Sequence, residues 1–170
     1  MITNITLTTK EKFLLEDSKS HEEQCIKKYS NYTSLASDDQ LKAVFRSNGQ
    51  KEQEHLETIN QLLTGKIPSM NNMGGGSQQQ TQQQSQQPTQ QQSQQQSQQT
   101  GSSNFSTSDK DLCMDMLTTE KYISGAYDTA IFEFRDAQIR DILNHIQKEE
   151  QKHGEAIFMY MESKGMYQAK

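Results

Sequence analysis

The sequence predicts an all-α protein, a four-helix bundle built from two helical hairpins. Apolar residues recur at alternating spacings of three and four along four long segments, which is the pattern of helices that pack side by side in a bundle. Helix start and stop signals bound the same segments. They define one hairpin at residues 8–66 and a second at residues 108–166, and we expect the two hairpins to form one domain.

The first hairpin has clear signals for two helices. Residues Thr8–Glu11 have the form of a capping box, and a helix is expected from there to about Ala36. Residues Ser37–Gln40 have the form of a second capping box, while Gly65, followed by Pro68, ends the second helix. The core-facing positions predicted for the first helix are Leu15, Ser18, Glu22, Cys25, Tyr29, Tyr32 and Ala36.

The second hairpin is organised in the same way. Residues Ser108–Asp111 open a third helix that runs to about Phe134. Residues Arg135–Gln138 turn the chain into a fourth helix, which ends near Gly165. The core-facing positions predicted for the fourth helix are Ile139, Leu143, Ile146, Glu150, His153, Ile157 and Tyr160.

A Gln-rich linker, residues 69–107, separates the hairpins, and its residues 78–99 include sixteen Gln. This composition cannot bury enough apolar surface to offset the entropy of ordering, so we expect a disordered segment. A flexible chain of this length reaches about 35 Å, close to the roughly 40 Å length of each helix. It can therefore cross the whole bundle, which is the ferritin-like connection and makes the third helix antiparallel to the first. A plain spacer, a self-associating segment and a substrate for glutamine cross-linking remain alternative roles for the linker.

A pattern of four residues occurs twice, with an offset of 98 residues. In order, Glu22, Tyr29, Glu52 and His55 recur as Glu120, Tyr127, Glu150 and His153. All eight occupy core-facing positions. Four ionised carboxylates in one core repel each other, and two divalent cations would neutralise them while both imidazoles remain neutral.

The spacing of the pattern is that of a di-metal site. A Glu and a His three residues apart lie on one helix face, so both can reach the same ion. One Glu from each of two helices and a Glu-x-x-His pair from each of the other two form the ligand set of di-iron and di-manganese bundles. Such oxygen and imidazole ligands suit iron or manganese, and zinc is also compatible. The predicted metal ligands are Glu22, Glu52, His55, Glu120, Glu150 and His153.

Other interpretations of the pattern stay open at this point. A duplicated hairpin can keep polar core residues as hydrogen-bonded pairs without a metal. A helix phase that differs by one residue would turn these groups to solvent. Tyr29 and Tyr127 are either hydrogen-bond donors near the metals or ordinary core residues.

The bulk composition excludes several classes of protein. Net charge is −5, and basic and acidic residues are mixed along the helices, so no nucleic-acid partner is expected. The N-terminus lacks the basic and apolar regions of a signal peptide, and no apolar run reaches the length of a membrane span. Cys25 and Cys113 fit buried, reduced cysteines.

Two short motifs bound the second hairpin, Asp115–Thr118 near its start and Lys164–Tyr167 at its end. Chiefly through these motifs, and over about 60 residues, the hairpin resembles the Coat F family of bacterial spore coat proteins. The resemblance implies a ferritin-like fold, a spore-forming source, and deposition on the spore coat from the mother-cell cytoplasm, with other coat proteins as partners. The metal ligands do not come from this family. The series Glu22, Tyr29, Glu52 and His55 is similar to that of di-metal ferritin-like proteins such as rubrerythrin and ferritin.

We therefore expect a spore coat protein with a structural or assembly role, carrying two iron or manganese ions and forming homo-oligomers. The balance favours a protein that is not an enzyme. The alternative function is that of a di-iron or di-manganese oxidoreductase of the peroxidase, catalase or ferroxidase kind. A helical adaptor without chemistry is the third possibility.

Overall fold

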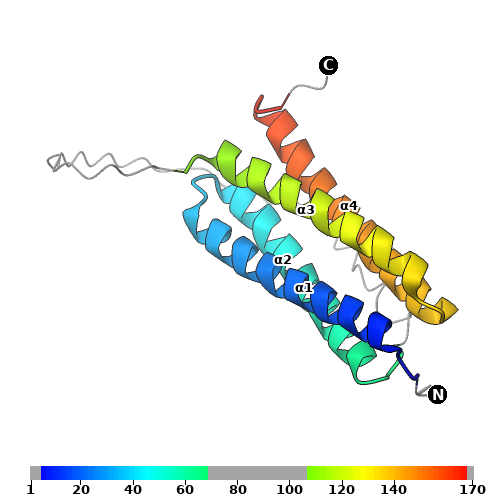
Figure 1. The fold of residues 1–170 in the computed structure, drawn as a ribbon. Coiled ribbons are helices and arrows are strands. Elements are labelled where there is room, and N and C mark those ends of the chain that lie inside the picture. The colour runs from blue at the N-terminus through cyan, green and yellow to red at the C-terminus, as the bar shows by residue number, and fades with distance from the viewer. Residues whose placement is uncertain (1–4, 69–106, 168–170) are drawn as a thin grey trace, which may run out of the picture.

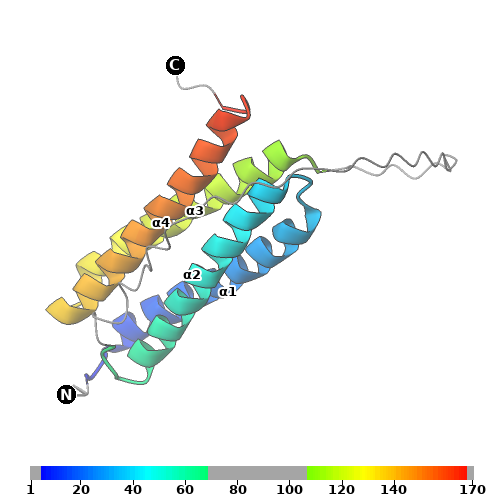
Figure 2. The ribbon, with the colours of Figure 1, turned by 180° about the vertical axis from the view of Figure 1, so that it is seen from behind.

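The structure, a computed structural model, describes residues 5–68 and 107–167 and is an all-α bundle. Its helices are α1 (Thr9–Leu35), α2 (Asp39–Leu63), α3 (Asp109–Glu133) and α4 (Ala137–Ser163). The first two helices pack as one antiparallel pair and the last two as another, and the pairs face each other (Figures 1 and 2). The prediction of an all-α bundle of two hairpins is confirmed. The disordered linker predicted at 69–107 lies, except for Thr107, outside the described residues.

Capping boxes begin the two odd-numbered helices. The capping box of α1 was predicted from the sequence, whereas for α3 only a helix start at Ser108–Asp111 was predicted. At α1, the Thr8 side chain accepts a hydrogen bond from the N–H of Glu11, and the Glu11 carboxylate accepts one from the N–H of Thr8. At α3, Ser108 and Asp111 exchange the same pair of bonds. These bonds satisfy backbone donors that a helix start leaves without partners.

The predicted capping box at residues Ser37–Gln40 was wrong. The N-cap of α2 is Asp38, whose carboxylate accepts from the N–H of Gln40. Ser37 lies one residue earlier, and its N–H and hydroxyl both donate to the Asp109 carboxylate. The reason is tertiary: the start of α3 lies against the α1–α2 turn, so Ser37 serves the contact between the hairpins.

Glycine ends both even-numbered helices. Gly65 and Gly165 have φ of 78° and 68°, a left-handed conformation that favours glycine. The N–H of Lys66 donates to the Gln61 carbonyl oxygen over 3.0 Å, and the N–H of Gly65 to the Leu62 oxygen over 2.9 Å. These two bonds form the Schellman motif that closes a helix.

The two hairpins are antiparallel to each other. Lys28 of α1 pairs with Asp115 near the start of α3 over 2.7 Å, whereas Lys10 near the start of α1 pairs with Glu133 at the end of α3. The end of α2 lies beside the start of α1, because the N–H of Ile5 donates to the Gly65 oxygen. The end of α2 and the start of α3 are therefore at opposite ends of the bundle (Figure 1). The antiparallel relation of α1 and α3 is confirmed.

The core matches the predicted spacing. All predicted core-facing positions of α4 are buried, and so are those of α1 except Tyr32, which is half-buried. The hydroxyl of Tyr32 donates to Asp115 over 2.6 Å, so its polar end remains near the surface. This core includes the eight residues of the repeated pattern.

A buried carboxylate, Glu11, joins the two hairpins where the start of α1 meets the α3–α4 turn. It accepts hydrogen bonds from the backbone N–H of Arg135 over 3.0 Å and from its side chain over 3.4 Å. Burial alone would raise the pKa of Glu11, but the N–H groups of Arg135 and Thr8 outweigh it and lower the pKa to about 2. Glu11 therefore stays ionised and holds the α3–α4 turn against the start of α1.

Candidate metal centre

Each helix contributes to one cluster of charged side chains in the middle of the bundle. Every member is at most 4% exposed. The alternative that a shifted helix phase turns these groups to solvent is thereby wrong. The cluster consists of the six residues predicted from the sequence, Glu22 on α1, Glu52 and His55 on α2, Glu120 on α3, and Glu150 and His153 on α4.

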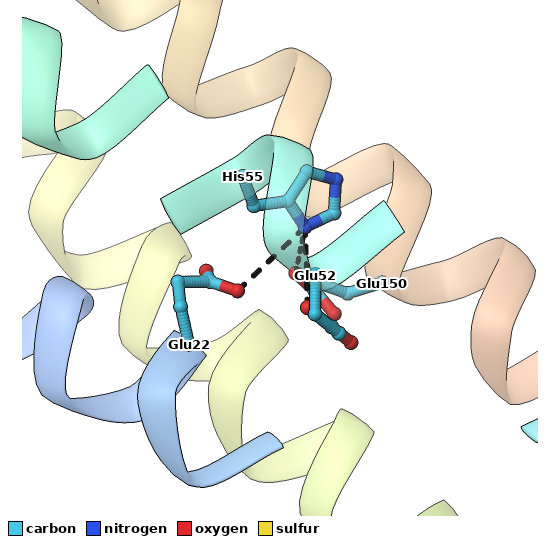
Figure 3. Close-up of side chains that lie close together, drawn as sticks. All are labelled: Glu22, Glu52, His55 and Glu150. Carbon is cyan, nitrogen blue, oxygen red and sulfur yellow. Dashed lines mark hydrogen bonds and ion pairs between the residues drawn. The ribbon is translucent and has the colours of Figure 1, made fainter. Parts of the chain in front are cut away.

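Three carboxylates surround His55. Its Nδ1 atom lies 3.1 Å from Glu150, 3.3 Å from Glu52 and 3.7 Å from Glu22. Figure 3 shows the three carboxylates converging on this nitrogen from three different helices. The one-turn spacing of Glu52 and His55 on α2 aims both side chains at the same point.

The second hairpin repeats the arrangement around His153. Its Nδ1 atom lies 3.0 Å from Glu52, 3.4 Å from Glu150 and 3.8 Å from Glu120. The two imidazole rings stack with their centroids 5.7 Å apart. The 98-residue offset in the sequence thus becomes an approximate twofold relation in space.

Glu52 and Glu150 belong to both halves of the cluster. The Oε2 atom of Glu52 faces His55 and its Oε1 atom faces His153, and Glu150 divides its two oxygens in the same way. Each half offers one ligand atom per residue, and these atoms lie within 4.8 Å of one another. Two groups of four buried side chains, sharing two carboxylates, could therefore each hold a metal ion.

The metal-free cluster balances its own charge. Burial opposes ionisation of Glu52, but hydrogen bonds from His153 and His55 outweigh it and lower its pKa to about 2. For His153, burial favours the neutral ring, yet bonds to the surrounding carboxylates raise its pKa to about 11. The surrounding carboxylates likewise raise the pKa of His55, and the two nearby imidazoles lower that of Glu150 against the effect of its burial. Two imidazolium ions then face two carboxylates.

The outer carboxyls are protonated in this state. Burial is the main cause that raises the pKa of Glu120 to about 8, and the charges of Glu52 and Glu150 add to it. Burial likewise raises the pKa of Glu22 well above its usual value. A low-dielectric core tolerates two anions beside two cations but not four anions.

The hydrogen bonding of the cluster is incomplete. Glu22 Oε2, Glu120 Oε2 and both oxygens of Glu150 are buried and take part in no hydrogen bond among the described residues. Buried polar atoms without partners are uncommon because each costs about 1–3 kcal/mol. All four atoms face the two imidazoles, where a cation would coordinate them, so the residues present fit a metal.

The two tyrosines cross between the hairpins. The Tyr29 hydroxyl of α1 donates to Glu120 of α3, and the Tyr127 hydroxyl of α3 donates to Glu22 of α1. Burial raises the pKa of both phenols well above the usual value, so they remain protonated donors. They contact the outer carboxylates, which supports the interpretation of these residues as hydrogen-bond donors beside the cluster. Asn48 supports Tyr29 by donating to its hydroxyl over 3.1 Å.

Sequence reasoning missed Glu149. It lies beside Glu150 on α4 but turns to the outer side of His55, whose Nε2 atom is 3.2 Å from the Glu149 carboxylate. The hydrogen bond with His55 lowers the pKa of Glu149 to about 2. A carboxylate at this place orients the ring and makes its other nitrogen more basic. Nothing in the repeat announced it, because Lys51 occupies the equivalent position in the first hairpin.

Fold and cluster together define a helical-bundle protein with a buried carboxylate–histidine centre. Residues 108–170 match the family model of the Coat F domain, in agreement with the resemblance of the second hairpin to that family. Comparisons with curated proteins and with solved structures gave no match. Among the described helices, none has the length and apolarity needed to cross a membrane.

Proposed function

We propose that this protein is a component of the spore coat whose bundle, with a ferritin-like connection, holds two divalent transition-metal ions. Glu22 and His55 would bind one ion, Glu120 and His153 the other, and Glu52 with Glu150 would bridge them. One observation carries the proposal, the convergence of four buried carboxylates and two imidazoles from all four helices. Iron or manganese suits this oxygen-rich ligand set best.

The role in the coat is structural. The Coat F domain supports a place in the coat, and the metals would tie the two hairpins into one domain. Several large apolar side chains remain at the surface, including Phe13, Tyr122 and Phe132. They support packing against other coat proteins or a second copy of this chain.

Metal content tests the proposal directly. The purified chain should carry close to two transition-metal ions, measured by elemental analysis. Replacing both bridging carboxylates, Glu52→Gln with Glu150→Gln, should abolish binding, while circular dichroism verifies that the variant remains helical. The matched control, Glu57→Ala with Glu162→Ala, changes exposed carboxylates on the same two helices and should keep both ions. A folded wild-type chain that takes up no metal would refute the proposal.

A second candidate function is a di-metal oxidoreductase. Two adjacent ions of variable valence supply electrons to dioxygen or peroxide when bound. The observation that favours this function is access, since Glu120 and Glu150 line a groove that opens at the surface. Tyr29 and Tyr127 would hold the outer carboxylates in place during such a reaction.

Oxidation of added Fe(II) distinguishes the two candidates. The chain is loaded with Fe(II) without air and then exposed to air, and the loss of Fe(II) is followed with a ferrous chelator. Oxidation much faster than in protein-free buffer or with the Glu52→Gln, Glu150→Gln variant supports the enzyme. Oxidation at the protein-free rate by a chain carrying two ions leaves the structural role alone.

A further inference from the structure

One groove at the surface borders the cluster. It has a volume of about 800 Å³, lies along α3 and α4, and includes Glu120 and Glu150 in its lining. Another groove, between α1 and α3 beside His21, reaches none of the six cluster residues. The first groove therefore lies on the side of the second hairpin, beside Glu150, which both halves of the cluster share, and Glu120, which contacts His153.

The approximate twofold symmetry breaks at this groove. Gly154 lines it, whereas the equivalent residue of the first hairpin, 98 positions earlier, is the half-buried Leu56. A Cβ added to Gly154 would lie 3.6 Å from Leu117 and 4.0 Å from the Cβ of Glu120, an ordinary contact distance. Packing thus does not require glycine here, and glycine inside a helix costs about 1 kcal/mol. What glycine provides is open space beside the cluster.

The charge at the mouth of the groove is also reversed. Lys121, Lys148 and Lys152 line it, and the equivalent positions of the first hairpin hold Glu23, Gln50 and Glu54. Within the described part of the chain, Lys121 and Lys148 form no ion pair, and Lys152 approaches Glu149 at 3.6 Å. Besides Glu120 and Glu150, the lining residues of this groove include one acidic residue, Glu155. Since the charges of the carboxylates in the floor are balanced within the centre, the lysines make the groove attract anions.

The walls between the lysines are apolar. Leu117, Phe158 and Tyr167 form them, and the two aromatic rings meet edge to face with centroids 5.1 Å apart. Apolar walls with a few charged groups at fixed places are typical of pockets for small organic molecules, and the volume is in the usual range. A molecule that fits both features has a negative head and an apolar body.

We propose that this groove binds an organic anion, a carboxylate with an apolar body, next to the metal centre. The lysines hold the negative charge, Leu117 and Phe158 contact the apolar body, and Gly154 leaves space for the ligand beside Glu120. The inference rests on the proposed function, because the ligand would lie beside the proposed metal ions.

Calorimetric titration of the metal-loaded full chain tests the inference with three probes. Octanoate has both features, acetate has only the charge, and octan-1-ol has only the apolar body. Octanoate should bind at least tenfold more tightly than either of the others. In the chain loaded with Co(II), octanoate should also shift the visible absorption bands of the metal, whereas octan-1-ol should not.

Two variants replace residues of the groove by the residue types at the equivalent positions of the first hairpin. Gly154→Leu should weaken octanoate binding at least tenfold while elemental analysis still finds two ions. Lys121→Glu with Lys152→Glu should weaken octanoate binding to a similar degree and leave octan-1-ol unchanged. Leu56→Ala, at the equivalent position of the opposite face, is the control and should bind octanoate as the wild type does.

The two proposals fail in different ways. If the chain carries two ions but binds octanoate no better than acetate, the proposed organic-anion site is refuted and the proposed metal site is not affected. Unchanged octanoate affinity in Gly154→Leu overturns the groove as the binding place. A chain without metal removes the proposed function, and this inference with it.

Discussion

Loading two divalent cations into the centre should release about four protons at neutral pH. In the metal-free chain at pH 7, both imidazoles and both outer carboxyls hold a proton, while the shared carboxylates are ionised. The pKa is raised to about 11 for His153 and to about 8 for Glu120, and it is lowered to about 2 for Glu52. Coordination requires four carboxylates and two neutral rings, so each His and each outer Glu loses a proton.

The number of protons also fixes the pH dependence of metal affinity. Below pH 8 the overall affinity for the two ions should rise by about four powers of ten per pH unit. Above pH 8 the slope should fall toward three, because Glu120 is then already ionised in the metal-free chain. His153 keeps its proton until about pH 11 and so contributes throughout this range.

Calorimetry in two buffers with different heats of ionisation measures the protons released per chain. Glu52→Gln with Glu150→Gln is the control and should bind no metal and release no protons. A release of only two protons at pH 7 would contradict the charge assignment, since two of the four assigned protons would then be absent before metal binds.

Three further results follow from the same contacts. In the presence of chelator, the melting temperature should fall by more than about 5 °C from pH 5 to pH 8. Folding raises the pKa of Glu120 from 4.5 to about 8 and that of His153 from 6.5 to about 11, so the folded chain loses stability as the pH rises over this interval. A melting temperature that rises instead would refute the assignment of protons to these two groups. Glu149→Gln should lower the affinity for the ion at His55 about tenfold and leave the affinity for the other ion unchanged, so that a metal titration shows two separate steps. The reason is that, of the two rings of the cluster, Glu149 contacts only His55. An equal loss of affinity for both ions would exclude an orienting role of Glu149. Glu11→Ala should lower the free energy of unfolding, measured in urea, by about 2–3 kcal/mol, because it removes a helix cap and leaves the N–H of Arg135 without a partner. The control is Glu16→Ala, at an exposed ion pair with Lys12, which should change the free energy of unfolding by no more than about 0.5 kcal/mol.

The helices could be predicted from the sequence because their signals are local. Capping at Thr8 and Ser108 depends on residues three positions away, and the left-handed Gly65 and Gly165 follow from glycine at a helix end. The burial of the six cluster residues follows from spacing within one helix. The N-cap of α2 was misplaced because Ser37 is used by Asp109, which is 72 residues away in the chain.

Relations between helices were less accessible. The pattern put Tyr29 and Glu22 on one helix face, but their partners are Glu120 and Tyr127 of the other hairpin, which only the antiparallel register determines. Glu149 was missed for a similar reason, because its contact with His55 joins α4 to α2. The asymmetry at Gly154 was visible as a difference from Leu56, yet its meaning depends on the groove between the helices.

The crossing of the tyrosines has a consequence for how the molecule must be made. Neither hairpin contains a whole group of four candidate ligands, since each group includes at least one residue of the other hairpin. Each tyrosine hydroxyl likewise donates its hydrogen bond to a carboxylate of the other hairpin. One hairpin by itself therefore lacks a complete ligand set. Under the proposed function, metal would bind only where two hairpins pack together, either within one chain or between two chains that exchange hairpins.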